Sequence, residues 1–418
     1  MITAIINGRL LDCVGDVPLE DASVVIEDGV IKEIYSKRKP VPRGATIIDV
    51  GGRTVMPGLT DAHDHPAYTE MNPEKAKNEP PLYIALKMAH NLERILQAGF
   101  TTIRDMGGAH WSLRQAVEDG LIRGPRLLIA CAMLSPTGGH GDENLHGERL
   151  SHNDLGRLRT TSRLCDGEAE CRKATREQIR KGADHIKIVA TGGIASPNDE
   201  PWHLQFCEAE IKAIVDEAES VGLYVGAHCE HDSGIRRAVK CGVRTIEHGL
   251  FLGEDTAKLM KEEGAYLVPT LATMWWGMTY GPEAGVADWA LRKYKEPLGP
   301  GKPDSLEAGM LAIQLARKVG VPIGSGADYW TSRSFGSEAI ELKLKTESGM
   351  TPYEAIKSAT IVNAEIMRMQ DKIGSLEVGK WADIIAVDGK PDEDINTLVE
   401  KDNIRLVMKQ GEVFRNIL

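Results

Sequence analysis

The middle of the chain repeats one pattern of polar and apolar positions. A segment whose apolar residues have helical spacing runs into a glycine, and a short apolar run follows at once. The repeat occurs at residues 98–103, 182–187, 222–228, 242–248, 264–270 and 320–324. Glycine just past the last helical residue ends a helix, and an unalternating apolar run is typical of a strand covered on both faces. Each repeat therefore predicts a helix followed by a buried strand.

Two more apolar runs, at residues 55–60 and 127–130, bring the expected strands to eight. Residues 351–354, Thr-Pro-Tyr-Glu, form a capping box with proline at the first helical position. An apolar stripe at helical spacing is formed by Leu82, Ala85, Ala89, Leu92 and Leu96. Eight strand–helix units in series predict an α/β protein with a (β/α)8 TIM barrel.

Both ends of the chain follow a different pattern. Short β-branched segments separated by Gly, Asp and Pro occupy the first fifty residues, and similar segments return after residue 381. We therefore expect a small β-sandwich domain built from both termini. The predicted boundaries are 1–54 for its first part, 55–370 for the barrel and 371–418 for its second part.

Composition and charge narrow the class of protein. The 418 residues are 42% hydrophobic and 27% charged, which is ordinary for a globular protein, and the net charge is -11. The acidic balance argues against nucleic acid or an anionic membrane surface as partner. Seven cysteines without a C-x-x-C pair predict reduced thiols. The first residues lack signal-peptide features, so the expected location is cytoplasmic.

Polar residues fall where a barrel places its active site, at the carboxyl ends of the strands. His63 and His65 close the first strand, and Lys187 lies in the fourth. The fifth and sixth strands end at His228 and His248, while Asp328 follows the eighth. The positions of these residues predict one cluster at the mouth of the barrel.

His63 and His65 place two imidazoles on the same side of an extended segment, because side chains alternate with period two. Two convergent neutral imidazoles make half of a site for zinc or a similar cation. A single H-x-H is weak evidence. Here it follows a buried strand that ends on polar residues, which favours the metal-ligand interpretation.

Lys187 lies inside the apolar run at residues 186–189, where a lysine is costly unless it is paired or modified. The alternative is a lysine at a strand end whose amine reaches solvent. The nearby histidines favour a functional role. A desolvated lysine has a lowered pKa, so its neutral amine can add carbon dioxide. The resulting carbamate has two oxygens and is able to bridge two cations.

His228, His248 and Asp328 each have a structural alternative. Either histidine alone could be a core residue with a satisfied hydrogen bond, and Asp328 could be a helix N-cap. Because the three share the strand-end positions of the other candidates, we interpret them as metal ligands. Asp328 is also expected to take the proton from a metal-bound water.

The chain resembles the amidohydrolase superfamily over nearly its full length, and most closely the imidazolonepropionase-like and prolidase-like branch. The matching segments are residues 55–65, 101–105, 137–141, 182–187, 246–249, 268–271 and 374–383. The resemblance implies that His63, His65 and Asp328 hold one ion and His228 and His248 the other. A carboxylated Lys187 bridges them, Asp328 accepts and donates the proton, and His140 assists the substrate carbonyl.

The resemblance has departures that affect the substrate. The eighth strand reads Gly-Ser-Gly-Ala-Asp up to Asp328, where relatives often have Gly-[Ser/Thr]-Asp. His231 stands about where prolidase-like relatives carry a contact to the substrate carboxylate, often aromatic, which puts a dipeptidase activity in doubt. Trp275, Trp276 and Trp330, expected in loops after strands seven and eight, predict a partly aromatic substrate pocket, with loop packing as the alternative.

The expected function is hydrolysis of an amide bond in a small molecule by a metal-bridging hydroxide, with two divalent ions, zinc being the expected metal. The amide would belong to an N-acyl amino acid, a dipeptide or an aryl amide. Alternatives are a lactone, carbamate or phosphotriester substrate at the same site, or a mononuclear deaminase or cyclic-amide hydrolase, against which Lys187 counts. A non-catalytic scaffold is disfavoured because all six ligands are present. The resemblance further implies a homo-oligomer.

Overall fold

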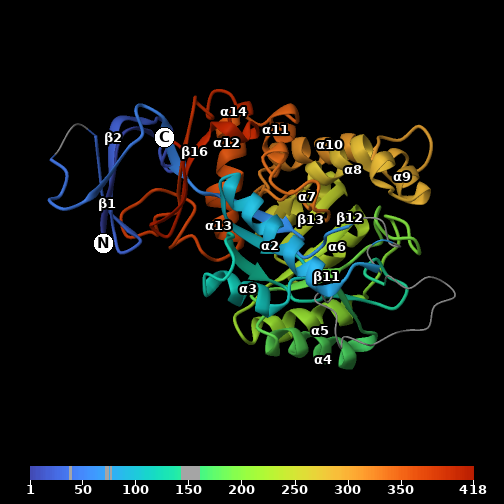
Figure 1. Ribbon diagram of the computed structural model, residues 1–418. Coiled ribbons are helices and arrows are strands. Elements are labelled where there is room, and N and C mark those ends of the chain that lie inside the picture. The colour runs from blue at the N-terminus through green and yellow to red at the C-terminus, as the bar shows by residue number, and fades with distance from the viewer. Residues whose placement is uncertain (37–39, 71–74, 76–77, 143–160) are drawn as a thin grey trace.

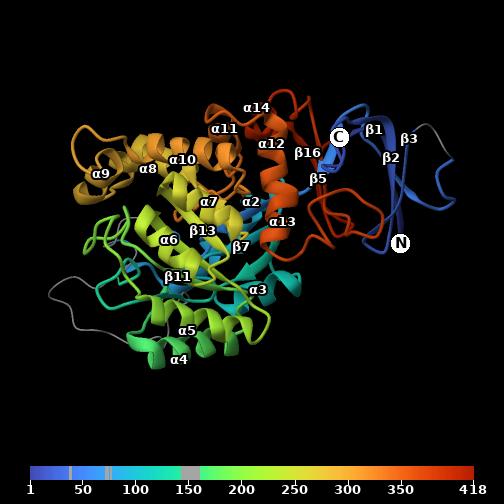
Figure 2. The same ribbon diagram turned by 180° about the vertical axis from the view of Figure 1, so that it is seen from behind.

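The computed structural model describes residues 1–36, 40–70, 75, 78–142 and 161–418. It has a sheet-rich part, which holds both ends of the chain, and a larger part in which helices surround parallel strands (Figure 1). The view from behind shows the helical segment with α12 and α13 between these two parts (Figure 2). Among the described residues, no helix is both long enough and apolar enough to cross a membrane.

The sheet-rich part is one eight-stranded sheet to which both ends of the chain contribute. Its order is β17-β16-β15-β5-β1-β2-β3, with β4 paired to β1. The strands are β1 (Ile2–Leu10), β2 (Leu19–Glu27), β3 (Val30–Ser36), β4 (Thr46–Asp49), β5 (Thr54–Pro57), β15 (Ile384–Val387), β16 (Ile404–Lys409) and β17 (Glu412–Asn416). Antiparallel pairing of β5 with β15 joins the N-terminal strands to the C-terminal ones. The sandwich form of this sheet stays a prediction.

The larger part has a TIM-barrel-like fold built from parallel strands. Three of them, β6 (Leu59–Asp64), β7 (Phe100–Asp105) and β8 (Arg126–Ile129), form one sheet. The second sheet has the order β10-β9-β11-β12-β13-β14. Its strands are β9 (Met133–Ser135), β10 (Ser162–Leu164), β11 (Ile186–Val189), β12 (Val225–His231), β13 (Thr245–Phe251) and β14 (Tyr266–Val268).

The eighth expected strand, at residues 320–324, is not a regular strand: Ile323 forms a single parallel bridge to Leu267, and residues 322–328 run between β14 and β6. The amide of Gly324 donates to the carbonyl of Leu267 at 2.8 Å, and the amide of Ala62 donates to the carbonyl of Ser325 at 2.7 Å. These bonds place Asp328 beside the end of β6, where His63 lies.

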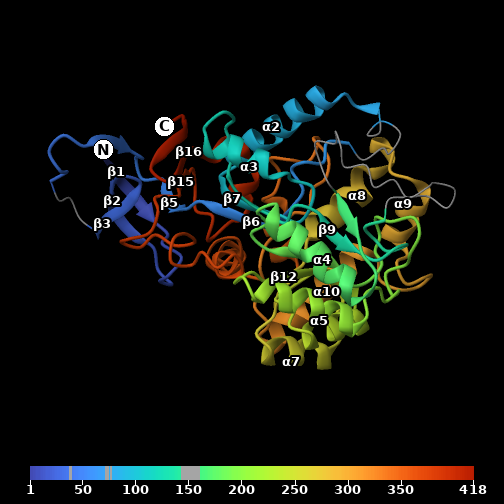
Figure 3. The ribbon, with the colours of Figure 1, turned by 90° about the horizontal axis from the view of Figure 1, so that it is seen from below.

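Helices cover the outer face of the strands, as the view from below shows (Figure 3). The longer ones are α2 (Pro81–Gln97), α3 (Trp111–Glu118), α4 (Gly167–Arg180), α5 (Glu208–Glu219), α6 (Asp232–Lys240), α7 (Glu254–Glu262), α8 (Leu271–Ala284), α9 (Asp288–Lys295), α10 (Ser305–Val319) and α11 (Ile340–Glu347). Shorter ones are α12 (Pro352–Lys357), α13 (Asn363–Ile366) and α14 (Asn396–Val399), with a π-helical segment at Ser358–Val362.

Several local predictions are confirmed. The Thr351 side chain accepts from the amide of Glu354, whose carboxylate accepts from the amide of Thr351, so the capping box is complete. Gly242 and Gly320 follow their helices with φ of 91° and 89°, a left-handed conformation that favours glycine. The apolar stripe of α2 differs at its start, because Leu82 is 74% exposed and the buried face begins at Met88.

The strand expected at residues 55–60 is in fact two strands that belong to different sheets. The break is at Gly58, whose amide donates to the carbonyl of Asp383 at 2.9 Å. A Cβ atom at Gly58 would lie 2.3 Å from the Thr101 hydroxyl oxygen. The sequence pattern showed one apolar run because both strands are fully buried. Only the close approach of β7 requires glycine at the junction.

We expect the substitution Gly58→Ala to destabilise the protein by about 1–3 kcal/mol, because the added methyl group must displace Thr101 in a packed core. Urea unfolding of the variant measures this loss. Gly15→Ala is the matched control, since a Cβ at Gly15 meets its nearest neighbour at 3.7 Å, an ordinary contact. Equal midpoints for the two variants would contradict the role of Gly58.

Candidate metal centre and active site

Three residues converge on one point: His63 and His65 at the end of β6, and Asp328 in the neighbouring segment. The Nε2 atoms of His63 and His65 each lie 3.3 Å from the Asp328 Oδ1 atom. Asp328 is held there by its own amide, which donates to the carbonyl of His63 at 2.7 Å. The pairing of β6 with the extended segment 322–328 thus brings together the residues that the H-x-H spacing and the strand-end position singled out.

His248 and His228 complete the cluster from β13 and β12. Their rings lie 4.6 Å apart, and the His63 ring lies 5.1 Å from that of His248. Side-chain ligand atoms of His63, His248 and Asp328 all lie within 4.8 Å of one another. β12 and β13 run in parallel, with Cys229 opposite His248, so His228 and His248 lie at nearly the same level at the ends of the two strands.

The backbone at this point is in an unusual conformation. His248, Thr270 and Asp328 have φ of 72°, 51° and 54°. Left-handed conformations at residues other than glycine cost on the order of 1–3 kcal/mol each and gather at functional sites. In β13 the side chains of Thr245 and Glu247 both accept from Arg104 on β7, so strict alternation would turn the next side chain, that of His248, to the other face. The positive φ of His248 coincides with the turn of its ring toward the site.

Each of the four clustered histidines uses one ring nitrogen on a partner in the protein. The pairs are His63 Nδ1 with Glu247 Oε2 at 2.8 Å, His65 Nδ1 with the Gly107 carbonyl at 2.8 Å, His248 Nδ1 with Thr270 Oγ1 at 2.7 Å and His228 Nε2 with the Gly192 carbonyl at 3.2 Å. A carbonyl accepts only from a protonated nitrogen, so the second nitrogen of a neutral ring keeps its lone pair. Such outer partners orient rings that bind metals.

Glu247 and Arg104 form a buried pair beneath the histidines that the sequence pattern did not reveal. Arg104 donates to Glu247 Oε1 at 2.9 Å and to Thr245 Oγ1 at 3.2 Å, and both charged side chains are fully buried. Burial opposes the charge of Glu247, yet Arg104 and His63 hold the pKa of this carboxyl well below its usual range. Glu247 therefore stays ionised and accepts from His63. The segment Ile246-Glu247-His248 was noticed in the sequence, but the partners of Glu247 can be seen only in the folded structure.

Lys187 lies in β11 with 2% of its surface exposed. Burial lowers the pKa of its amine to about 8, with opposing contributions from the nearby charges of Glu247 and Asp328. Glu247 and Asp328 are also the carboxylates that contact the clustered histidines, so the lysine lies beside the cluster. A desolvated amine of this kind is available in its neutral form.

His140 stacks on His228 with ring centroids 3.9 Å apart and an interplanar angle of 12°. The conformation of the loop that carries His140 could not be predicted from the sequence pattern. The ring Nδ1 lies 2.8 Å from the Ser196 hydroxyl, and burial lowers the pKa of the ring to about 4. The structure therefore places His140 next to the cluster, on the side of the ring of His228.

Two other residues expected to contact substrate, His231 and Trp330, form hydrogen bonds within the protein. His231 caps α6: its ring accepts from the amide of Ser233 and lies 2.9 Å from the hydroxyl of the same residue. Its contact with substrate stays a prediction. Trp330 donates from its ring nitrogen to the Thr273 hydroxyl at 3.2 Å, which ties the loop after Asp328 to the start of α8.

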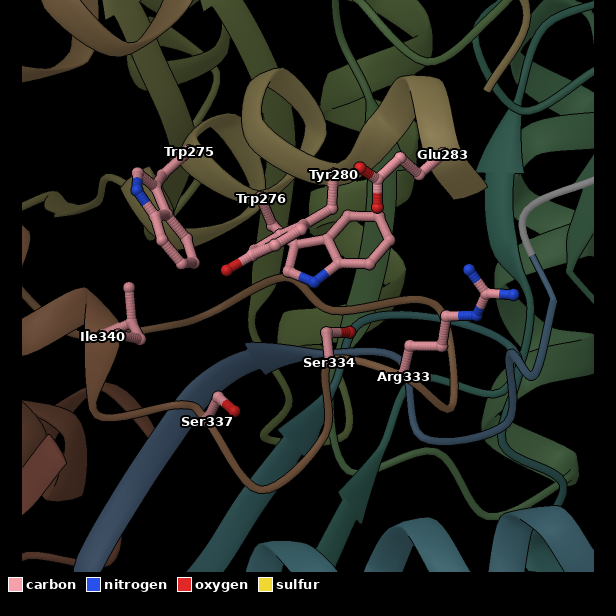
Figure 4. A pocket seen from close by; sticks show the side chains of 8 residues that line it. All are labelled: Trp275, Trp276, Tyr280, Glu283, Arg333, Ser334, Ser337 and Ile340. Atoms are coloured by element: carbon pink, nitrogen blue, oxygen red, sulfur yellow. The ribbon is translucent and has the colours of Figure 1, made fainter. Parts of the chain in front are cut away.

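Trp275 and Trp276 lie on helix α8 rather than in a loop. The segment shows no clear helical period because most of its side chains are apolar or glycine, which is typical of a buried helix. A pocket of about 410 Å³ lies between α8 and the loop that leads to α11 (Figure 4). It is lined by Trp275, Trp276, Tyr280, Glu283, Arg333, Ser334, Ser337 and Ile340. The tryptophans thus border a cavity.

The donor set fits a divalent cation. Neutral imidazole nitrogens with a carboxylate are ligands of zinc and similar cations. In His63 and His248 the Nδ1 atoms are occupied by Glu247 and Thr270, which leaves the Nε2 atoms for a metal. Asp328 adds the negative charge. Burial opposes this charge, yet the nearby imidazoles hold the pKa of the Asp328 carboxyl well below its usual range.

Comparison with known proteins places this site in a family. The model of the amidohydrolase family matches residues 54–414. Ochratoxinase from Aspergillus niger is 33% identical over 434 aligned residues, covering 99% of this chain and 87% of that protein. Imidazolonepropionase from Pseudomonas putida is 25% identical, with 95% of each chain covered.

Solved structures agree. The structure of a prolidase in complex with N-methylphosphonate-L-proline has a TM-score of 0.94 and 38% identity, and the match covers all of both chains. The resemblance seen in the sequence to the imidazolonepropionase-like and prolidase-like branch is confirmed. Enzymes of this family generally use metal ions, in keeping with the cluster of His63, His248 and Asp328. By sequence, fold and the position of its cluster, this chain belongs to the amidohydrolase family.

Proposed function

We propose that this protein is a metal-dependent hydrolase that cleaves an amide bond in an N-acyl amino acid, a dipeptide or an aryl amide. The observation that carries the proposal is the convergence of His63, His65 and His248 on the carboxylate of Asp328 at the mouth of the barrel. Similarity to a prolidase and to ochratoxinase supports a substrate with an amide bond.

In this proposal His63, His65 and Asp328 hold one divalent cation, and His228 and His248 hold a second. A carboxylated Lys187 would supply a ligand to both, because its buried amine lies near Asp328, His228 and His248. When bound, such cations lower the pKa of water toward neutrality and polarise the carbonyl of the substrate.

The side chains divide the remaining work. The Asp328 carboxylate takes the proton of the attacking water on an oxygen and passes it to the leaving amine, a step that general acid–base catalysis accelerates by about 10²- to 10⁴-fold. His140 contacts the carbonyl group of the substrate from its position on the ring of His228. Trp275 and Trp276, on the wall of the pocket in Figure 4, contact the apolar part of the substrate. Trp330 and His231 are proposed as further contacts with the substrate.

Removal of metal should abolish hydrolysis. Protein dialysed against a chelator is expected to release no amine from N-acyl amino acids, Xaa-Pro dipeptides or aryl amides, and zinc with bicarbonate should restore the release. Elemental analysis of the restored protein should count two metal ions per chain. The control is protein dialysed without chelator.

Different outcomes separate the alternatives. One ion per chain with full activity would favour a mononuclear deaminase or cyclic-amide hydrolase. Two ions without amine release, together with hydrolysis of a lactone, carbamate or phosphotriester, would replace the amide by that bond. A chelated protein that keeps its full amide hydrolysis would falsify the proposal.

A further inference from the structure

A buried lysine holds the loop that follows β11. Lys293, on α9, is 2% exposed, and its ammonium donates to three backbone carbonyls. They belong to Gly193 at 3.0 Å, Ser196 at 2.8 Å and Asp199. An ammonium has three hydrogens, so each one has its own acceptor in this loop. Lys293 thus gathers residues 193–199 around a single positive charge.

The Asp199 carboxylate holds the same loop from within. Its Oδ1 atom accepts from the amide of Gly193 at 3.1 Å and from the hydroxyl of Ser196. Its Oδ2 atom accepts from Gln205 at 2.7 Å, and the side-chain oxygen of Gln205 accepts from the amide of His140 at 3.1 Å. Asp199 therefore reaches His140 by two routes, through Gln205 to its backbone and through Ser196 to its ring.

The direction of these bonds determines which nitrogen of His140 carries hydrogen. A hydroxyl has one hydrogen, and a carboxylate is the stronger acceptor for it. The second acceptor near the Ser196 hydroxyl, the carbonyl of Gly193, lies 3.4 Å away. Because the hydrogen of Ser196 is used on Asp199, its oxygen accepts from His140 Nδ1 at 2.8 Å. The Nδ1 atom is then protonated, and Nε2 of a neutral ring bears the lone pair.

We propose that Ser196, Asp199 and Lys293 are positioning residues that hold His140 in its Nδ1–H form, with its ring parallel to that of His228. Lys293 fixes the loop, Asp199 orients the hydroxyl and Ser196 receives the ring hydrogen. Nε2 of the neutral ring then bears the lone pair, so this atom donates to the substrate carbonyl, the role proposed above, only after it has gained a proton. The inference deepens the role of His140 and rests on the proposed function for its effect on hydrolysis, but the hydrogen-bond arrangement itself does not.

Nuclear magnetic resonance of protein with ¹⁵N-labelled histidine tests the arrangement without any substrate. Long-range proton–nitrogen correlations distinguish the two neutral forms of each ring, and His140→Gln identifies the signals of His140. We expect the Nδ1–H form in the unchanged protein and its loss in Ser196→Ala. Ser112→Ala is the matched control, because it removes a similar bond, of 2.8 Å, between Ser112 and His110 on the surface. An Nε2–H form of His140, or an unchanged Nδ1–H form in Ser196→Ala, overturns the proposal.

Hydrogen–deuterium exchange tests the part played by Lys293. In Lys293→Met we expect faster exchange in peptides that span residues 193–199, because three carbonyls lose their common donor. Lys295→Met, an exposed position on the same helix, should leave that exchange unchanged. Equal exchange in both variants contradicts the clamp. If Lys293→Met does not fold, the histidine signals of Ser196→Ala still decide the proposal.

Kinetics connect the arrangement to hydrolysis. Loss of the partner that orients a metal-binding histidine costs on the order of 10- to 100-fold in activity, and we expect a similar factor for His140. Ser196→Ala is expected to lower kcat by this factor with its metal content unchanged, while Ser112→Ala keeps full activity. If Ser196→Ala alters the position of the hydrogen on the His140 ring but leaves kcat unchanged, the arrangement has no effect on catalysis. A protein without amide hydrolysis would contradict the proposed function and leave the histidine measurement intact.

Discussion

Replacing Lys187 with alanine is expected to abolish amide hydrolysis and to reduce metal binding. Divalent cations contribute several kcal/mol to stabilisation of the transition state, and each 1.4 kcal/mol is worth about tenfold in rate, so the loss should be on the order of 10³-fold. The physical reason is that, under the proposed function, the alanine variant lacks the amine that would form the carbamate shared by the two cations. Amine release and elemental analysis on the same preparation measure both effects.

Small carboxylates provide the control for this prediction. The cavity left by Lys187→Ala should admit formate or acetate, whose two oxygens can take the place of a carbamate. We expect partial recovery of activity and of metal content at high carboxylate concentration. Folding of the variant is checked by its far-ultraviolet circular dichroism. A Lys187→Ala protein with both metal ions and unchanged activity would show that the lysine has no part in the site.

The second large effect concerns stability. Glu247→Ala leaves the guanidinium of Arg104 buried without its ionic partner and removes the acceptor of His63. Breaking a buried pair from one side costs about 3–5 kcal/mol, because the remaining charge is uncompensated. We expect the free energy of unfolding to fall by this amount, measured by denaturant titration of the metal-free protein. Metal affinity should fall as well, since the ring of His63 loses its orientation.

A surface pair is the matched control for Glu247. Lys343 and Glu347 lie 2.7 Å apart, one turn from each other on a helix, with side chains 40% and 45% exposed. Exposed pairs of this kind contribute about 0.3–0.5 kcal/mol, so Glu347→Ala should barely change the unfolding midpoint. Similar losses in Glu247→Ala and Glu347→Ala would mean that the buried pair is not a stabilising contact.

The positions of most strands in the barrel-like part were predictable because helix ends carry a local chemical signal, whereas β9 and β10 were not predicted. A glycine in the left-handed conformation, as at Gly242 and Gly320, marks the point where a helix stops, whatever lies around it. The candidate ligands were predictable for a related reason. Parallel strands end at one level, so polar residues at strand ends, such as His63 and His228, must share that level.

Other features depend on contacts that a single segment does not contain. Val55 and Leu59 belong to different sheets, and the strand break between them is at Gly58, where Thr101 approaches the backbone closely. The orientation of His248 follows from a positive φ that local sequence does not signal. The loop around Ser196 depends on Lys293, about a hundred residues further along. Such features arise from tertiary packing and not from periodicity.

The pairing of β5 with β15 has a consequence for synthesis on the ribosome. Residues 58–383 lie between these neighbouring strands, so β5 emerges long before the strand that covers its edge. At typical translation rates this interval is on the order of tens of seconds. During that time the N-terminal strands present an unpaired edge, a known starting point for aggregation. The edge of β5 therefore stays uncovered until β15 has been made, and we expect the nascent chain to be prone to aggregation until that point.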